Sequence, residues 1–404
     1  GRALDLILSG RFVGAEEAER IGLVTKLTET DDPLAEALAY LGAITQYGLP
    51  ALALAKSAVT RALDLPIVEG LKVEAELFRE LMTGPQSAAQ RYYFFAERAA
   101  NKIPDIAKDT PTIDVHKAGV LGAGTMGGGI AMNFANVGIP VTIVEVNDEA
   151  LERGLGIVRK NYERSASRGS IPAEAVDERM ALITGSTDKH DFADCDIVIE
   201  AVFEDMELKK TIFAELDQIC KPGAIMASNT SALDVNEIAS ATTRPEWVIG
   251  MHFFSPANVM KLLENVRGDK SNDTVVASTM AIGKQIGKVC AMVGVCRGFV
   301  GNRMLAMRGA EAEKMLMEGA TPAQIDSVLY EFGFPMGPFS MSDLAGLDIG
   351  WKAEKSTSST IREVMCESGR RGQKNGRGYY TYDPETRAAT PDLDVEQMIR
   401  NFAE

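Results

Sequence analysis

Residues that bind metals or form disulfides are few in this sequence. The five cysteines stand at positions 195, 220, 290, 296 and 366, an odd number with no CxxC spacing. Such a set argues against a disulfide framework and against a zinc site. We therefore expect buried free thiols and no bound metal.

Histidine is also scarce, with three residues at positions 116, 190 and 252. Because histidine is the usual general base near neutral pH, candidates for acid–base chemistry are few. His116 and His190 stand in polar surroundings before apolar runs, which favours surface positions. His252 follows the apolar run 247–251 and is the strongest candidate.

Positive charge and long apolar runs are lacking as well. Lysine and arginine total 42 against 57 acidic residues, and the formal net charge of −15 disfavours nucleic acid or an anionic membrane as a partner. We find no signal peptide, no apolar segment of membrane length and no lipidation motif. We therefore expect no membrane span and an intracellular location.

Strand-like patterns are missing from the first hundred residues. Apolar residues recur there at helical spacing over 33–45, 51–63, 68–82 and 87–100. The polar segment 101–115, with two prolines, is a predicted domain boundary. A length of 404 residues suggests two or three domains.

Glycine, in contrast, is concentrated in one stretch. Residues 117–146 read KAGVLGAGTMGGGIAMNFANVGIPVTIVEV, which is an apolar run, a turn, a helix pattern and a second apolar run. Gly122 permits the tight turn, Gly124 lets the backbone approach a pyrophosphate, and Gly127 lets the helix pack on the strand. The phosphates would lie at the helix N-terminus, which begins with Thr125 and Met126.

The second apolar run, 141–144, delivers Glu145 at its carboxyl end, where a carboxylate binds the ribose hydroxyls. The same carboxylate repels the 2′-phosphate of NADP. Strand, turn, helix, second strand and acid occur in the order of a complete dinucleotide-binding unit, which a lone GxGxxG does not provide. The sequence therefore predicts NAD as the cofactor.

Downstream, apolar runs alternate with helix patterns. Strands are predicted within 193–203 and at 224–228 and 248–254, with a helix at 206–220 and a helical excursion at 147–180. This alternation predicts an α/β fold with a parallel, doubly wound sheet. After Val300 we expect no strands, and helix patterns at 304–318, 322–331 and 343–352 predict an all-helical domain.

His252 stands at the carboxyl end of a predicted strand, where an open α/β sheet places its ligands. After the turn 255–258, residues 259–266 could run back and bring Glu264 to the imidazole. A carboxylate there would fix the tautomer and make His252 a general base. A structural core histidine with a solvated Glu264 is the alternative. The loop 227–231 either caps the next helix or hydrogen-bonds a substrate oxygen.

Several motifs together carry a resemblance to a known family: LGAGTMGGGIA, DIVIEAVFEDMELKK, ASNTSAL, MHFFSPANVMKLLE, RGFVGNR, GFPMGPFSMSDLAGLD and GRGYYTYD. Residues 117–390 resemble the 3-hydroxyacyl-CoA dehydrogenase part of the multifunctional fatty-acid β-oxidation enzymes. Residues 1–100 resemble the end of their enoyl-CoA hydratase/isomerase part, a crotonase-type fold. The resemblance implies NAD-dependent oxidation of L-3-hydroxyacyl-CoA to 3-ketoacyl-CoA.

The resemblance also implies roles for catalytic residues. His252 and Glu264 match the family's catalytic histidine and its glutamate partner, with His252 taking the proton of the 3-hydroxyl. Ser231 matches the residue that hydrogen-bonds the substrate oxygen. Asn302 matches an asparagine that completes the site from the helical domain.

Further contacts with the cofactor are implied for Asn229, Glu204 and Lys209, the last as a partner for a phosphate or ribose. Ala232 departs from the family, which has a serine there, and this change should be tolerated. The motif reads FFSP here, whereas the short monofunctional enzymes have FFNP, and this difference favours a resemblance to the multifunctional enzymes.

The implied domains are a crotonase-like remnant at 1–100, a linker at 101–115, an NAD-binding Rossmann domain at 116–296, a helical dehydrogenase domain at 297–391 and the start of a downstream segment at 392–404. The chain is expected to be truncated at both ends. Because the strands, oxyanion loop and glutamates of the hydratase are missing, neither hydratase nor isomerase activity is expected. Expected partners are an acyl-CoA and either a second copy or missing parts of the parent enzyme, in the cytoplasm or, in a eukaryote, the peroxisome.

Two other functions compete with this one. A dehydrogenase of free β-hydroxy acids would usually rely on a catalytic lysine rather than a histidine–glutamate pair. A non-catalytic relative, such as the lens crystallin that shares this fold, would not need Ser231, His252, Glu264 and Asn302 together.

Overall fold

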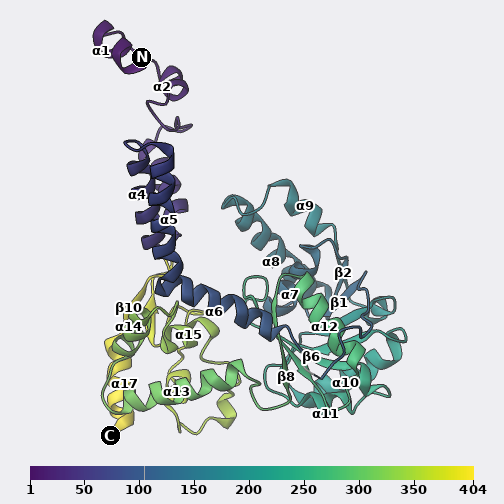
Figure 1. Cartoon of the computed structure of the whole chain (residues 1–404). Coiled ribbons are helices and arrows are strands. Elements are labelled where there is room, and N and C mark those ends of the chain that lie inside the picture. Colours follow the sequence, from purple (N-terminus) through teal and green to yellow (C-terminus); the bar gives the residue numbers. More distant parts are fainter. Residues whose placement is uncertain (104) are drawn as a thin grey trace. The chain divides into compact units, whose positions relative to one another are not determined.

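The computed structural model describes residues 1–103 and 105–404. They divide into two compact units, Gly1–Arg98 and Ala99–Glu404, whose elements are labelled in Figure 1. Pro104, in the predicted linker, lies outside the described residues.

The first unit is helical wherever it has regular structure. Its helices are α1 (Arg2–Ser9), α2 (Ala15–Ile21), α3 (Pro33–Thr45), α4 (Leu49–Ala62), α5 (Ile67–Thr83) and α6 (Pro85–Ala100), the last continuing across the unit boundary. The four helices predicted from the sequence are confirmed, each to within two residues at its ends. Asp32 caps α3 by accepting a hydrogen bond from the Ala35 amide, and Pro33 fits the first helical turn.

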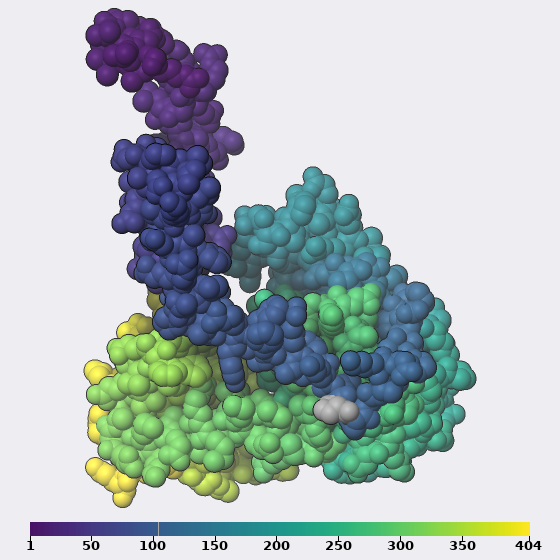
Figure 2. All heavy atoms as spheres, in the orientation of Figure 1, coloured from purple at the N-terminus to yellow at the C-terminus, as the bar shows by residue number. Residues whose placement is uncertain are grey.

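Few apolar side chains of this unit are buried. The large apolar residues of α4 and α5 are exposed or only partly buried, with Val59 69% exposed and Phe78 65% exposed. Ala18 is the one residue of Gly1–Arg98 that is buried. A groove of about 620 Å³ runs between α4 and α5 and is lined almost entirely by apolar residues. This unit is coloured purple to dark blue in Figure 2.

No single helix among the described residues has the length and apolar composition needed to cross a membrane. The pair Pro33–Thr45 and Leu49–Ala62, bent by 104°, meets that test only when the two helices are taken together.

The second unit contains an eight-stranded sheet with the order β3-β2-β1-β4-β5-β6-β7-β8. Its strands are β1 (Ala118–Leu121), β2 (Val141–Val144), β3 (Ile183–Ser186), β4 (Ile197–Glu200), β5 (Ile225–Ser228), β6 (Val248–Phe253), β7 (Leu262–Arg267) and β8 (Val289–Gly294). Neighbouring strands are parallel except β6 and β7. The strand order reverses between β1 and β4, which is where such sheets open a ligand crevice.

Helices cover both faces of this sheet, as predicted. They are α7 (Thr125–Ala135), α8 (Asp148–Ser167), α9 (Glu174–Met180), α10 (Met206–Ile219), α11 (Val235–Ala239) and α12 (Asp273–Gln285), with short 3₁₀ turns at Lys189–Phe192 and Pro245–Trp247. Because strand side chains alternate, Ile197 and Ile199 join the core with α7, α8 and α12, whereas Val198 joins the core with α10 and α11.

The segment before β1 is attached to this sheet domain. Ile103, Ile106 and Ile113 pack against the core that contains α12, and Arg267 donates to Asp105 across 2.6 Å. The polar, proline-containing pattern that predicted a linker did not reveal these three isoleucine contacts.

The C-terminal part of the unit is mainly helical but not wholly so. Its elements are α13 (Gly301–Met317), α14 (Pro322–Phe332), α15 (Pro338–Ala345), a 3₁₀ turn at Ala353–Lys355, α16 (Ile361–Glu367), β9 (Tyr380–Tyr382), β10 (Ala389–Pro391) and α17 (Leu393–Ala403). The expectation of no strands after Val300 is wrong, because β9 and β10 form an antiparallel pair. The helix predicted at 343–352 is also wrong beyond Ala345, where Gly346 takes a φ of +107°.

Two buried aspartates organise this domain. Asp326 accepts hydrogen bonds from the amides of Phe339 and Ser340, and Asp343 accepts them from the amides of Tyr379 and Tyr380. Glycines make room for them.

A Cβ at Gly337 would lie 2.2 Å from the Asp326 carboxyl group, and one at Gly378 would lie 2.0 Å from Asp343. The motifs GFPMGPF, SDLAG and GRGYY thus form one carboxylate-centred core. Val395 and Ile399 of α17, in the segment predicted to start a downstream part, are buried in the same core.

Candidate active site

The glycine turn after β1 has the geometry that its sequence predicts. Gly122 has a φ of +103°, and a Cβ there would lie 2.8 Å from the Ala201 carbonyl oxygen. A Cβ on Gly127 would lie 1.9 Å from the Gly122 oxygen, so only glycine allows α7 to approach β1. Gly124 is exposed and its Cβ would meet nothing within 4 Å, which leaves space for a pyrophosphate above the first turn of α7.

Glu145 lies directly after β2, beside this turn. One carboxylate oxygen accepts a hydrogen bond from the Ala123 amide across 2.8 Å, and the other accepts one from the Val146 amide. The acid is therefore held at the carboxyl end of β2, next to the turn that would hold the phosphates. The residues fit NAD, whose ribose hydroxyls can donate to a carboxylate in this place.

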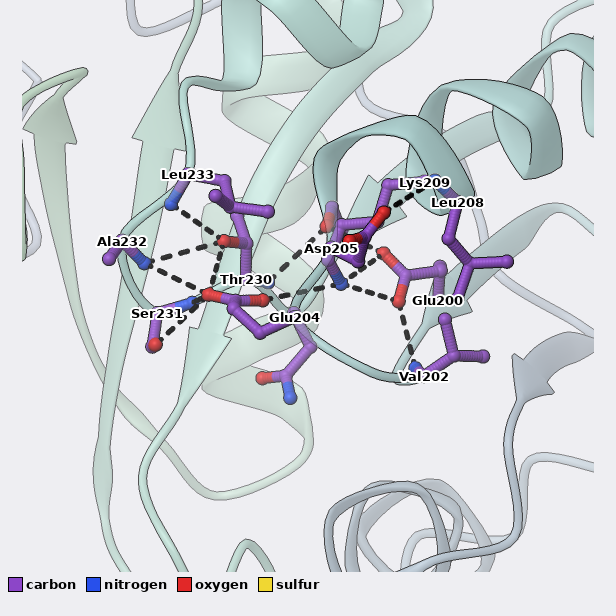
Figure 3. A network of polar contacts seen from close by, with 12 residues as sticks. Glu200, Val202, Glu204, Asp205, Leu208, Lys209, Thr230, Ser231, Ala232 and Leu233 are labelled. Carbon is purple, nitrogen blue, oxygen red and sulfur yellow. Dashed lines mark hydrogen bonds and ion pairs between the residues drawn. The ribbon is translucent and has the colours of Figure 1, made fainter. Parts of the chain in front are cut away.

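Lys209 is bound within the protein. Its ammonium contacts both oxygens of Glu200 at 2.7 and 2.8 Å, and the two side chains are 1% and 0% exposed. Ser228 and the Val202 amide also donate to Glu200, as Figure 3 shows in part. A phosphate or ribose would have to compete with Glu200 for this lysine, so its predicted contact with the cofactor stays a prediction.

Glu204 gathers the donors of the loop after β5. The Thr230 hydroxyl and the Ser231 amide each donate to one Glu204 oxygen across 2.7 Å, and the Ser231 hydroxyl donates across 3.0 Å (Figure 3). Burial raises the pKa of Glu204, but the nearby Lys209 charge and these hydrogen bonds outweigh burial and lower it. Glu204 thus remains ionised and fixes Ser231.

The two explanations of the loop 227–231 can now be separated in part. The helix that follows, α11, is capped by Asp234, which accepts a hydrogen bond from the Asn236 amide. The loop is therefore not the cap. Asn229 accepts a hydrogen bond from the Phe253 amide across 2.9 Å, which joins the ends of β5 and β6.

His252 and Glu264 form a buried pair. The two residues face each other in the antiparallel register of β6 and β7, and His252 Nδ1 lies 2.8 Å from Glu264 Oε2. His252 is 5% exposed and Glu264 is 2% exposed. A solvated Glu264 is excluded, and the pairing leaves Nε2 as the imidazole nitrogen not engaged by the carboxylate.

Glu264 also joins the sheet to the start of α13. Its other oxygen accepts hydrogen bonds from the amides of Val300 and Gly301, at 3.1 and 2.8 Å. Burial raises the pKa of Glu264, but the hydrogen bond from His252 and those two amides outweigh it and lower the pKa. Asn302, the next residue, places Nδ2 3.4 Å from the Ser231 carbonyl oxygen. The structure thus brings together all four residues that were predicted to be catalytic.

Three neighbours of the pair were not assigned from the sequence. The rings of Phe254 and Phe299 lie 4.4 and 5.6 Å from the imidazole, centroid to centroid. Phe299 is fully buried with a φ of +49°, a costly backbone conformation for a bulky residue. Gly301 has no room for a Cβ, which would lie 2.8 Å from the Phe254 ring. Phe299 and Gly301 both belong to the motif RGFVGNR, so the motif could have indicated that these two residues lie at the site.

A crevice of about 320 Å³ opens beside the glycine turn. It is lined by Gly124 and Thr125 of the turn, by α8 and by the connection between β6 and β7. These lining residues include Asn161 and Arg164 of α8 and Arg168, which directly follows that helix. These two arginines were not assigned from the sequence, although two cations four residues apart in an acidic chain were a usable signal.

The structure also locates the cysteines and the other two histidines. All five cysteines are free, four of them buried, and His116 and His190 are exposed. Over residues 1–103 and 105–404, no cluster of three or more histidine, cysteine or acidic side chains could hold a metal.

Comparisons with known proteins match this architecture. Residues 117–296 match the family described as 3-hydroxyacyl-CoA dehydrogenase, NAD binding domain, and residues 298–382 match its C-terminal domain. The chain is 40% identical to the peroxisomal bifunctional enzymes of Danio rerio and Homo sapiens over 99% of its length. It spans 63% of the length of each of these relatives.

Solved structures are similar as well. A (S)-3-hydroxybutyryl-CoA dehydrogenase from Ralstonia eutropha is 35% identical with a TM-score of 0.61, covering 67% of this chain and 100% of that one. The dehydrogenase part of a multifunctional enzyme from C. elegans is 33% identical with a TM-score of 0.58, covering 77% of this chain and 74% of that one. With both domain matches, the chain belongs to the 3-hydroxyacyl-CoA dehydrogenase family of NAD-dependent oxidoreductases.

Proposed function

We propose that this chain oxidises the 3-hydroxyl of an L-3-hydroxyacyl-CoA to a 3-ketone in fatty-acid β-oxidation, with NAD as the oxidant. The observation that carries the proposal is the buried His252–Glu264 pair, which lies next to Asn302 and Ser231 at one end of the sheet. Bound NAD supplies the hydride acceptor, and the chain supplies orientation and proton transfer.

His252 is the general base in this proposal. Because Glu264 accepts from Nδ1, the neutral imidazole holds its proton on Nδ1 and presents Nε2 to the substrate hydroxyl. Glu264 stabilises the imidazolium that forms when His252 takes the proton. Ser231 and Asn302 then hold the substrate oxygen as it becomes a carbonyl.

The cofactor residues form a second group. Gly122, Gly124, Thr125, Met126 and Gly127 hold the pyrophosphate, and Glu145 binds the adenosine ribose. Asn229, Glu204 and Lys209 are assigned to the cofactor, with Lys209 as a partner for a phosphate or ribose. Figure 3 shows the network that holds Glu204 and Lys209.

The crevice beside the glycine turn supports a CoA ester as the substrate. The exposed guanidinium groups of Arg164 and Arg168 line it, and a coenzyme A moiety carries several phosphate charges. In a chain with a net charge of −15, two arginines at one crevice favour an anionic ligand there. A free hydroxy acid is also an anion, but it carries one carboxylate and none of the phosphates of coenzyme A.

Several wider assignments also remain proposals. We propose 1–100 as a crotonase-like remnant without hydratase or isomerase activity, 101–115 as the linker, 116–296 as the NAD-binding domain, 297–391 as the helical dehydrogenase domain and 392–404 as its extension toward a downstream segment. The peroxisomal names of the relatives support a peroxisomal location if the source is eukaryotic. Association with a second copy, or with further parts of a longer protein, completes the proposal.

The test is an NADH absorbance assay with acetoacetyl-CoA, with free acetoacetate as the matched substrate. The proposal expects turnover of the CoA ester only. Equal turnover of the free acid would favour the competing hydroxy-acid dehydrogenase, and no turnover of either would support a non-catalytic relative. A parallel assay with crotonyl-CoA should show no hydration above background.

A further inference from the structure

Lys288, at the end of the turn before β8, is a buried amine that no step of the proposed reaction uses. The residue is 7% exposed, and within the described part of the chain its ammonium has no carboxylate partner. Burial lowers the pKa of Lys288 to about 8. The nearby Cys290 thiol raises this pKa, but by less than burial lowers it. Since burying an unpaired charge is unfavourable, the hydrogen bonds that this ammonium makes must offset that cost.

Those hydrogen bonds go to one short segment. Lys288 donates to the carbonyl oxygen of Ala257 across 2.6 Å and to that of Met260 across 2.9 Å. Both carbonyls belong to the connection between β6 and β7. This connection joins the strand that carries His252 to the strand that carries Glu264.

The same connection is held from α7. Asn133, which is 4% exposed, donates its side-chain amide to the Ala257 oxygen across 3.1 Å. A Cβ on Gly129 would lie 3.1 Å from both the Ala257 Cβ and the Asn258 amide. Gly129 lies outside the GxGxxG pattern, so its lack of a side chain serves the contact with this connection.

The two residues between the fixed carbonyls line the crevice. Asn258 and Val259 lie between Ala257 and Met260, and both face the same cavity as Arg164 and Arg168. Holding the backbone at 257 and 260 therefore fixes one wall of the crevice opposite α8. A loosened wall would enlarge the crevice without moving the glycine turn.

We propose that Lys288 and Asn133 are positioning residues whose hydrogen bonds hold the β6–β7 connection in place. Gly129 allows α7 to pack directly against this connection. Together the three residues determine the shape of the crevice on the side assigned to the acyl-CoA. The inference rests on the proposed function, because it takes the crevice as the site of a CoA ester. Lys288 and Asn133 themselves do not line the crevice and would act on it through the β6–β7 connection. Their effect should be on KM for the CoA ester.

The test compares Lys288→Met with Lys284→Met in steady-state assays with acetoacetyl-CoA and NADH. Lys284 is exposed near the end of α12, so its replacement removes the same charge from the same region without touching the connection. Lys288→Met should raise KM for acetoacetyl-CoA by about tenfold, the loss expected for hydrogen bonds from a charged group. The kcat and the NADH dissociation constant, measured by fluorescence, should stay within about threefold.

Two further variants keep the inference testable if Lys288→Met folds poorly. Asn133→Ala removes the second donor to the Ala257 oxygen, and Gly129→Ala pushes against the connection from α7. Both should raise KM for the CoA ester, and the Lys288 and Asn133 effects should not add, because the two donors share one acceptor. Lys288→Arg, which keeps the donors, should recover part of the loss.

The outcomes separate this inference from the proposed function. If the unchanged chain reduces acetoacetyl-CoA and Lys288→Met has the same KM as Lys284→Met, the positioning role is refuted while the function stands. Equal losses in kcat and in NADH affinity would also overturn it, because they would mean a general structural role. If the unchanged chain does not reduce the CoA ester, the proposed function has failed first.

Discussion

Between Gly1 and Arg98 one residue, Ala18, is buried, whereas Ala99–Glu404 contains three separate clusters of buried apolar residues. The amphipathic pattern of the helices does not explain this difference in burial. Helix α5 exposes Leu71 and Phe78, while α10 buries Phe213 and Leu216 completely. An amphipathic helix becomes part of a core only where another element covers its apolar face, and α10 has a sheet to pack on.

From this contrast we expect the catalytic activity and most of the folding stability to depend on residues of the second unit. Every residue assigned to the proposed reaction belongs to the well-packed unit, where closely packed neighbours restrict the positions of buried side chains. The first unit has an exposed apolar groove instead, and such surfaces promote association.

The largest effect should come from a single side chain in the packed unit. His252→Gln should lower kcat by about 10²- to 10⁴-fold, because the hydroxyl proton loses its acceptor. NAD binding, measured by fluorescence titration, should be nearly unchanged. The matched control is His190→Gln at an exposed site. Wild-type turnover in His252→Gln would refute the assignment of the base.

Core and surface truncations should differ strongly in the free energy of unfolding. Ile199→Ala, at a fully buried site in β4, should cost about 2–5 kcal/mol by leaving a cavity. Leu63→Ala, at a residue that is 82% exposed, should change it by less than about 0.5 kcal/mol. Thermal melting of both variants checks this. A large loss for Leu63→Ala would mean that the first unit is covered by a partner in solution.

The buried carboxyl group of Asp343 should make the free energy of unfolding of the helical domain depend on pH. Burial raises the pKa of Asp343 from 3.8 to about 6, because hydrogen bonds from Tyr379, Tyr380 and Tyr382 compensate only in part. The folded pKa lies above the unfolded one, so the protonated form is favoured by folding. The stability from this group is present below pH 4 and is lost as the pH rises through about 6.

Asp343→Asn should remove that slope, which corresponds to about 3 kcal/mol between the two pH limits. Its absolute stability will also fall, because the amide cannot accept every hydrogen bond that Asp343 accepts. Urea unfolding at several pH values separates the two effects. A parallel curve for the variant and the unchanged chain would show that Asp343 does not titrate in this range.

The smallest effect concerns the choice of cofactor. Glu145→Ala should narrow the preference for NAD over NADP by about tenfold, because a like charge near the 2′-phosphate is removed. The ratio of kcat/KM values for the two cofactors is the measurement. Equal use of both cofactors by the unchanged chain would contradict this role for Glu145. Since Glu145 also accepts from the Ala123 amide, Glu145→Gln is the better control for the shape of the turn.

Much of the fold could be predicted because local patterns dominate it. Helix α3 matches its predicted range, and β2 is bounded by Pro140 and Glu145 as expected. The misses have local causes as well. The strands β9 and β10 have three residues each, too short to produce a strand pattern, and Gly346 ended a helix whose apolar spacing continued.

The catalytic pair shows the limit of spacing arguments. From spacing alone, His252 and Glu264 could have been unrelated, and the family motifs were needed to choose between the alternatives. The antiparallel register of β6 and β7 brings them together. The sequence could not predict the hydrogen bonds from the start of α13 to Glu264. Their donors are the backbone amides of Val300 and Gly301, and every residue except proline has such an amide.

The sequence by itself determined the dinucleotide turn, the acid that follows β2 and the helical character of both ends, because each of these depends on residues within a few turns of one another. Only the tertiary structure decided the partners of buried charges. Lys209 is held by Glu200, Lys288 by the carbonyls of Ala257 and Met260, and Asp343 by backbone amides. A charge can be buried only beside groups that offset its lost hydration, and those groups are brought to it by the packing of distant segments.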